Sequence, residues 1–247
     1  MSEAPVLLWP ELAGPGTHVL DGPAQHYLCN VLRLRAGDAV ELRDGRGAAA
    51  RGRLTAVERR RATLELEAPQ ALPVPPGPRL HLAMPLLKGR RLDWALEKCT
   101  ELGVSDFHLY VGRHGVVRRD RAPERYGEIL RAAFAQCRRP LLPALDGPAP
   151  FADLLSRATT EGWRQAWADE RGAGRGQAPF ALADGEDLLA WVGPEGGFSA
   201  EERAALEAAA SLRLDLGAQR LRAETAAVAA TCALLLPRGE TKPPAAR

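Results

Sequence analysis

The stretch with the clearest chemical signature is Val192-Gly193-Pro194-Glu195-Gly196-Gly197-Phe198. Its three glycines would let a ligand approach the backbone closely, because no side chain stands in the way. The stretch lacks the lysine of a GxxxxGKS/T phosphate loop, and Glu195 would repel a phosphate. An acidic, glycine-rich loop suits a neutral or cationic ligand, or a ribose whose hydroxyls need acceptors. A tight connection that binds no ligand is the alternative.

A second loop could border the same cleft. Leu216 and Gly217 end an apolar stretch of strand length, and Arg222, Glu224 and Thr225 fall within one turn of the helical pattern that follows. Two strand-end loops that face one cleft favour a binding site more than either loop does alone. A surface ion pair that caps the helix is the alternative here.

Basic residues open another helical pattern. Lys88 and Arg90 stand at its start, and Gly103 ends it. The helix dipole disfavours cations at this position unless an anion lies nearby, and a phosphate group would supply that anion. We interpret Trp94 and Leu96 as core residues of this helix rather than as platforms for a nucleobase.

These motifs belong to a run of alternating strand and helix patterns that begins near residue 80. Such alternation predicts a mainly parallel sheet covered on both faces, with the ligand site at the carboxyl ends of the strands. Ser199 and Glu202 fit a capping box at the start of one helix. We expect strands at residues 80–86, 107–111, 163–168, 187–192 and 212–216, and helices at 92–102, 126–137, 151–160, 199–210 and 221–236.

The first third of the chain follows a different pattern. Alternating apolar and polar residues at 39–43 and 62–67 predict half-buried strands, and a short helix is expected after Asp21. Four prolines within residues 73–78 then predict a stiff linker. We therefore expect a small β-barrel-like domain over residues 1–72 and an α/β domain over residues 80–247.

Charge is unevenly distributed along the chain. The formal net charge is only +2, yet the sequence from Arg33 to Arg61 contains nine arginines and four acidic residues. The sequence from Arg113 to Arg139 contains eight arginines and three acidic residues. Basic faces of this kind suit the phosphate backbone of a nucleic acid. For either stretch taken alone, a solvated surface is an equally good interpretation.

The composition also excludes several classes of protein. No apolar run reaches the ~20 residues of a membrane span, and the first residues lack a signal-peptide pattern, so a cytoplasmic protein is expected. The four cysteines and five histidines lack the spacing of a metal or redox site. No metal is therefore predicted, and the cysteines are interpreted as reduced and mostly buried. The absence of a GxGxxG after the first strand weakens a nucleotide-binding oxidoreductase as an alternative.

Three stretches of the chain resemble the signatures of the RsmE-type methyltransferases of the SPOUT superfamily. They are LLKGRRLDWALEKCTELGV at Leu86–Val104, VGPEGGFSAEE at Val192–Glu202, and LG followed by LRAETAA at Leu216–Ala227. Their order and spacing are similar to the family's as well, so the resemblance covers almost the whole chain. Members of this family methylate N3 of a uridine in 16S ribosomal RNA and use S-adenosylmethionine.

The resemblance implies a fold, an assembly and a cofactor. The expected fold is α/β, with a SPOUT-type trefoil-knotted methyltransferase domain preceded by a small PUA-like RNA-binding β-barrel. A homodimer is implied, and so is 16S ribosomal RNA or the small ribosomal subunit as partner. S-adenosylmethionine would be held largely by backbone groups of Val192, Gly193, Pro194, Gly196, Gly197, Leu216, Gly217, Leu221 and Thr225.

Catalytic and RNA-binding roles complete these expectations. Methylation of a ring nitrogen requires an aligned donor and acceptor and loss of the N3 proton. We expect Arg222 to stabilise negative charge on the uracil oxygens, while Glu224 or Glu195 orients Arg222 or receives the proton. The expected RNA-binding residues are Arg33, Arg35, Lys88, Arg90, Gln136 and Arg139.

The chain departs from the family pattern in three places. Residues 6–9 lack the arginine that is common in the first strand, the helix near residue 137 lacks a glutamate, and Ala218-Gln219-Arg220 replaces a Pro-Arg-aliphatic run. These differences concern how RNA and the target uridine are held. The alternatives are the same fold acting on a 2′-hydroxyl or another RNA, and a non-catalytic RNA-binding protein of ribosome assembly.

Overall fold

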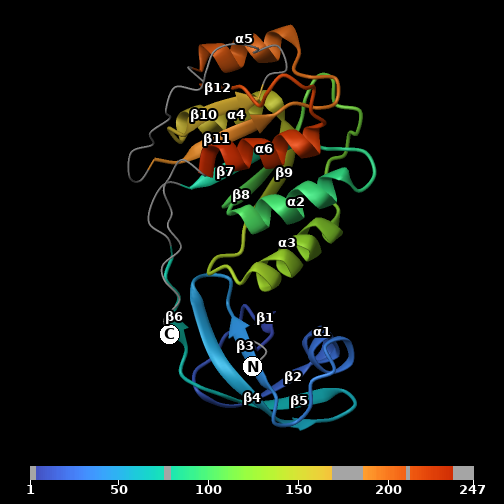
Figure 1. Cartoon of the computed structure of the whole chain (residues 1–247), viewed down its shortest axis with the longest axis vertical. Coiled ribbons are helices and arrows are strands. Elements are labelled where there is room, and N and C mark those ends of the chain that lie inside the picture. The colour runs from blue at the N-terminus through green and yellow to red at the C-terminus, as the bar shows by residue number, and fades with distance from the viewer. Residues whose placement is uncertain (1–3, 75–78, 169–185, 210–211, 236–247) are drawn as a thin grey trace. The chain divides into compact units, whose positions relative to one another are not determined.

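The computed structural model describes residues 4–74, 79–168, 186–209 and 212–235 (Figure 1). The chain divides into two compact units, Met1–Pro75 with Phe134–Leu142, and Pro76–Ala133 with Pro143–Arg247. No sequence pattern predicted that residues 134–142 group with the amino-terminal unit. Three prolines of the predicted linker, within residues 75–78, and the glycine-rich stretch 171–177 lie outside the described residues.

The amino-terminal unit is built on a six-stranded β-sheet. Its order is β1-β3-β4-β5-β2, with β6 paired to β4, and every pair is antiparallel except β1 with β3. The predicted short helix forms as α1 (Gly22–Gln25) and one π-helical segment, η1 (His26–Val31). The strands are β1 (Val6–Leu8), β2 (Gly16–Asp21), β3 (Ala39–Arg43), β4 (Ala48–Val57), β5 (Arg61–Leu66) and β6 (Gln70–Ala71).

Alternation along these strands creates the core of this unit. Val40 and Leu42 of β3 and Leu64 of β5 are almost fully buried, and Leu28 of η1 packs in the same cluster. The residues between them on each strand point to the opposite face. The arginines of β4 remain at the surface, and the unit keeps the basic character that the sequence predicted.

The carboxyl-terminal unit is an α/β sandwich with one parallel six-stranded sheet. Its strand order is β12-β10-β11-β7-β8-β9. The strands are β7 (Leu80–Pro85), β8 (Asp106–Val111), β9 (Ala144–Pro150), β10 (Arg164–Ala168), β11 (Leu188–Val192) and β12 (Leu212–Leu214). The helices are α2 (Arg91–Leu102), α3 (Glu124–Cys137), α4 (Phe151–Thr160), α5 (Ala200–Ala208) and α6 (Ala223–Leu235).

Helices cover both faces of this sheet, as the alternating pattern predicted. α2 and α6 lie side by side, and α6 packs against β7 and β11 (Figure 1). On the opposite face, Trp167 and Trp191 pack with Phe151 of α4 and with Phe198. Burial of each large apolar side chain contributes roughly 1.5 to 3 kcal/mol. The packed sheet therefore holds the ends of its strands in fixed positions. The trefoil knot remains a prediction that rests on the resemblance to the family.

Two interpretations of single residues need correction. Trp94 is 43% exposed and is not a core residue, whereas Leu96 is fully buried as expected. All four cysteines are free, but only Cys99 is buried, and Cys29, Cys137 and Cys232 are half-buried. Burial raises the pKa of the Cys99 thiol to about 12. Within the described ranges, no helix is long and apolar enough to cross a membrane.

Candidate functional site

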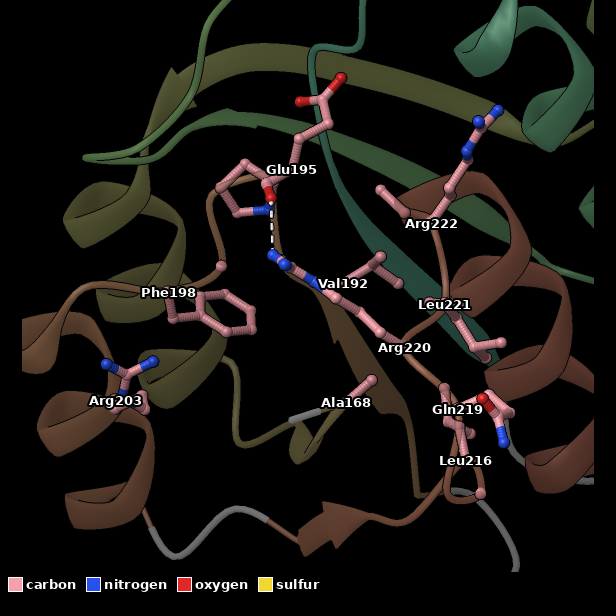
Figure 2. A pocket seen from close by; sticks show the side chains of 16 residues that line it. Ala168, Val192, Glu195, Phe198, Arg203, Leu216, Gln219, Arg220, Leu221 and Arg222 are labelled. Carbon is pink, nitrogen blue, oxygen red and sulfur yellow. Dashed lines mark hydrogen bonds between the residues drawn. The ribbon is translucent and has the colours of Figure 1, made fainter. Parts of the chain in front are cut away.

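A cavity of about 350 Å³ opens where β10, β11 and β12 end (Figure 2). Ala168 and Val192 are the last residues of β10 and β11, and Leu216 follows β12 by two positions. The volume falls at the lower end of the roughly 300 to 1,000 Å³ typical of small-molecule sites. The carboxyl edge of the sheet is thus the candidate site, at the place the strand pattern predicted.

Most of the predicted site residues meet at this cavity. Its walls include Val192, Gly193, Pro194, Glu195, Gly197, Leu216, Gly217, Leu221 and Arg222. Gly196, Glu224 and Thr225 do not line it in the described structure. Sequence reasoning missed several wall residues: Ala168, Phe198, Arg203, Gln219, Arg220, Ala223 and Ala226.

The first loop is held at both of its ends. At the strand end, the Tyr110 hydroxyl donates to the Val192 carbonyl over 2.7 Å. Burial raises the pKa of Tyr110 well above its usual value, so this phenol remains a donor. At the helix end, the Glu202 amide donates to Ser199 Oγ at 3.2 Å, and the Ser199 amide donates to Glu202 Oε2 at 2.8 Å. The predicted capping box is therefore confirmed.

The glycines of the two loops serve different purposes. Gly217 has a φ of +102°, and nothing lies within 4 Å of the position its Cβ would take, so a ligand can approach its backbone. A Cβ on Gly196, in contrast, would lie 2.8 Å from Cβ of His114. A side chain at position 196 has no room because another segment of the chain packs against Gly196.

Two carboxylates beside the cavity lack hydrogen-bond donors. Both carboxylate oxygens of Glu195 and Oε2 of Glu224 are buried and have no hydrogen-bond partner among the described residues. Arg91 lies near both groups, with its Nη1 3.5 Å from Glu195 Oε1 and its Nε 3.8 Å from Glu224 Oε1. Buried acceptors without donors are costly. A ligand that brings N–H or O–H groups or a positive charge would satisfy them.

Arg91 is the main charged residue that sequence reasoning missed. It is the first residue of α2, and Arg90 before it is the N-cap. Ala95 and Cys99, at four and eight positions after Arg91, are buried. Helical spacing places Arg91 above them, on the inward side. From that spacing, the sequence could have predicted that Arg91, unlike the exposed Arg90, lies on the side of the buried residues.

Two further arginines border the cavity at the second loop. The Arg220 guanidinium donates to the backbone carbonyl of Glu195 over 3.4 Å, as the dashed line in Figure 2 shows. The Arg222 carbonyl accepts from the Ala226 amide at 2.8 Å, so Arg222 immediately precedes α6. In Figure 2 the side chains of Glu195 and Arg222 extend toward the same edge of the view. Both residues line the cavity, so its wall carries a cation and an anion.

The predicted RNA-binding residues are divided between the two units. Lys88 and Arg90 are exposed in the turn before α2. Arg33, Arg35, Gln136 and Arg139 belong to the amino-terminal unit, and all but Arg139 are exposed. Among the described residues, no group of three or more histidine, cysteine or acidic side chains could hold a metal ion.

Comparison with known proteins gives the same assignment for both units. Residues 75–235 match an RNA methyltransferase domain, and residues 20–67 match an RNA methyltransferase PUA domain. Ribosomal RNA small subunit methyltransferase E of Mycobacterium bovis is 31% identical over 221 residues, which cover 86% of this chain and 83% of the relative. The Bacillus subtilis protein of the same name is 28% identical over 233 residues, which cover 88% and 89%.

A solved structure extends this similarity to the fold. The crystal structure of a ribosomal RNA small subunit methyltransferase E from Neisseria gonorrhoeae, bound to S-adenosyl methionine, matches with a TM-score of 0.84. The two chains are 27% identical, and the match covers 94% of this chain and 97% of the other. The methyltransferase domain match alone spans well over half of the sequence. The chain therefore belongs to the RNA methyltransferase family, together with the ribosomal RNA small subunit methyltransferases E to which it is similar.

Proposed function

We propose that this chain is an S-adenosylmethionine-dependent methyltransferase that methylates N3 of a uridine in the 16S ribosomal RNA of the small subunit. The observation that carries the proposal is the cavity at the ends of β10, β11 and β12, walled by glycine-containing loops and by Glu195, whose carboxylate oxygens have no hydrogen-bond partner among the described residues. Relatives that match over most of this chain are named ribosomal RNA small subunit methyltransferase E, which supports methylation of small-subunit ribosomal RNA.

The cavity residues fit S-adenosylmethionine. This cofactor has ribose hydroxyls, an ammonium group and a positively charged sulfur, and it has no phosphate. The carboxylate oxygens of Glu195, which have no hydrogen-bond partner among the described residues, suit such a ligand, and the space beside Gly217 lets it reach the backbone. When bound, the cofactor supplies an electrophilic methyl group. Backbone groups of Val192, Gly193, Pro194, Gly197, Leu216, Gly217 and Leu221 would hold it.

The chain's charged residues then have distinct tasks. Arg222, at the rim, stabilises the negative charge that grows on the uracil oxygens as N3 loses its proton. Glu195 or Glu224 receives that proton or orients Arg222. Arg91 lies between these carboxylates and limits their mutual repulsion. The start of a helix disfavours a cation, and the two acidic neighbours offset that cost for Arg91.

The rest of the molecule brings the RNA to this site. In our proposal, the PUA-like unit contributes affinity through Arg33, Arg35, Gln136 and Arg139, while Lys88 and Arg90 contact phosphates near the cavity. Contacts of this kind position the nucleic acid without reading its sequence. We also propose that the protein acts as a homodimer in the cytoplasm, where small ribosomal subunits are its partner.

Nucleoside analysis of ribosomal RNA tests this function in cells. A strain that lacks the gene should contain no N3-methyluridine in its 16S ribosomal RNA, and a plasmid copy of the gene should restore it. An Arg222→Ala copy, expressed to the same level, should restore little or none. Unchanged N3-methyluridine in the deletion strain would overturn the assignment.

A further inference from the structure

The connection between β8 and α3 carries a second group of cations beside the cavity. Arg113, Arg118, Arg119 and Arg121 are all exposed, and Asp120 is the only acid among residues 112–123. In the described part of the chain, no carboxylate lies within ion-pair distance of any of these four arginines. Other exposed arginines of the same unit do have such partners, including Arg125, Arg157, Arg164 and Arg213.

This arginine loop, residues 113–121, is fixed to the cavity at its first end. The Arg113 amide donates to Glu202 Oε1 over 2.7 Å, and a ring nitrogen of His114 lies 3.3 Å from the carbonyl oxygen of Gly197. Cβ of His114 also occupies the space that a side chain at Gly196 would need. The first end of the loop therefore packs directly on the glycine loop that walls the cavity.

The helix that follows the loop, α3, is fixed near the basic turn before α2 by Arg125 in its first turn. Arg125 Nε lies 3.1 Å from Asp93 Oδ1, and the same guanidinium lies 3.5 Å from the Gly89 carbonyl. Gly89 separates Lys88 from Arg90, two residues already expected to contact RNA. The arginine loop thus connects the glycine loop of the cavity with a helix whose first turn lies against the Lys88–Arg90 turn.

Several neighbouring cations that form no ion pair repel one another, and an anion relieves that repulsion. A small anion needs only a few convergent donors, whereas a nucleic acid offers phosphates at regular intervals along its chain. We propose that the arginine loop binds the phosphate backbone of the RNA substrate beside the nucleotide that enters the cavity. This proposal rests on the proposed function and adds a phosphate-binding surface to it.

The test compares two double variants that remove the same charge. R118Q/R119Q removes two arginines of the loop, and R164Q/R213Q removes two exposed arginines that pair with Glu186 and Glu207 elsewhere in the unit. The dissociation constant for small ribosomal subunits that lack the methyl group is measured at several salt concentrations. For R118Q/R119Q we expect roughly tenfold weaker binding at physiological salt and a log–log salt slope smaller by about 1.4 to 1.8.

The control variant should bind as the wild type does, and R118K/R119K should recover most of the affinity because lysine keeps the point charge. S-adenosylmethionine affinity should be unchanged in every variant. If R118Q/R119Q retains the wild-type affinity and salt slope while the wild type methylates RNA, the loop is only a solvated surface. If the wild type transfers no methyl group at all, the proposed function fails, and the binding data still decide the role of the loop.

Discussion

Glu195 and Glu224 present buried oxygens that no hydrogen-bond donor of the described chain meets, and Arg91 lies between them. Sequence reasoning found both carboxylates, because each follows a glycine-bearing strand end in a short motif. It missed Arg91, because Arg90 and Arg91 are adjacent and of the same type. Only their positions relative to the buried face of α2 distinguish them. It also assigned Gly196 to the ligand; in the structure Gly196 does not line the cavity, and a Cβ there would meet His114. A sequence motif does not show contacts with distant segments of the chain, such as the contact between Gly196 and His114.

Arg222 gives the sharpest prediction at this scale. If it stabilises charge that develops during proton loss, Arg222→Ala should lower the single-turnover methylation rate about 100- to 1,000-fold. S-adenosylmethionine affinity, measured by titration calorimetry, should fall far less. Lysine keeps the charge but loses the planar fork, so Arg222→Lys should recover only part of the rate. An equal fall in rate and cofactor affinity would make Arg222 a binding residue instead.

The packing of Gly196 on His114 can be tested by a double-mutant cycle. A methyl group at 196 collides with Cβ of His114, so Gly196→Ala should lower the free energy of unfolding by about 1 to 3 kcal/mol. In the H114G background the collision is absent, and the same change should cost much less. The coupling free energy from urea unfolding of the four proteins measures this. Additive effects would show that the two residues do not meet.

At the scale of elements, the hydrophobic periodicity and the residues that start and end helices predicted most of the strands and helices. The strands and helices expected from residue 80 onward all form, and the Gly103 stop and the Ser199 cap are confirmed. β9 (Ala144–Pro150) was missed because its glycine and prolines resemble a loop. As an edge strand it tolerates them, since one of its sides needs no ladder hydrogen bonds. Edge position depends on the whole sheet and cannot be read locally.

Two buried histidines on β7 and β8 make this sheet sensitive to acid. His81 Nδ1 lies 3.2 Å from His108 Nε2, and both rings pack with Trp163. Burial, with a smaller effect from the neighbouring His81, lowers the pKa of His108 to about 4. Burial also lowers the pKa of His81, against the opposing effect of Asp106. The charged groups around the pair are Asp106, Asp146, Asp187, Arg79 and Arg157.

This arrangement predicts how stability depends on pH. Above pH ~6.5 His108 is neutral in both states and has no effect, whereas between ~6.5 and ~4 only the unfolded chain takes up the proton. The free energy of unfolding should therefore fall by about 3 kcal/mol across that window. Urea unfolding of wild type and His108→Gln at several pH values isolates this contribution. Parallel pH profiles for the two proteins would rule it out.

At the scale of the whole molecule, a basic PUA-like unit accompanies a catalytic α/β unit. Composition and the change of pattern near residue 72 indicated two domains, and the structure adds residues 134–142 to the first unit. That grouping depends on long-range contacts, such as the Leu142 amide donating to the Gly45 carbonyl. No local pattern encodes it. The predicted RNA-binding residues are divided between the two units.

Neutralising the amino-terminal cations should separate binding from chemistry. Arg33 and Arg35 are exposed, so R33Q/R35Q should lower the salt slope of RNA binding by about 0.7 to 0.9 for each phosphate that these arginines neutralise. The methylation rate at saturating RNA should remain near that of the wild type. Filter binding and single-turnover assays give the two quantities. A lower rate at saturating RNA would mean that this unit also shapes the active site.

The most direct measurement is methyl transfer by the purified protein itself. The chain is incubated with S-adenosylmethionine labelled in its methyl group and with small ribosomal subunits that lack the modification, and nucleosides of the digested RNA are identified by mass spectrometry. Our account predicts one labelled N3-methyluridine per 16S ribosomal RNA and one S-adenosylhomocysteine for each methyl group transferred. Label on a 2′-hydroxyl or on another base, or cofactor binding without any transfer, would contradict it.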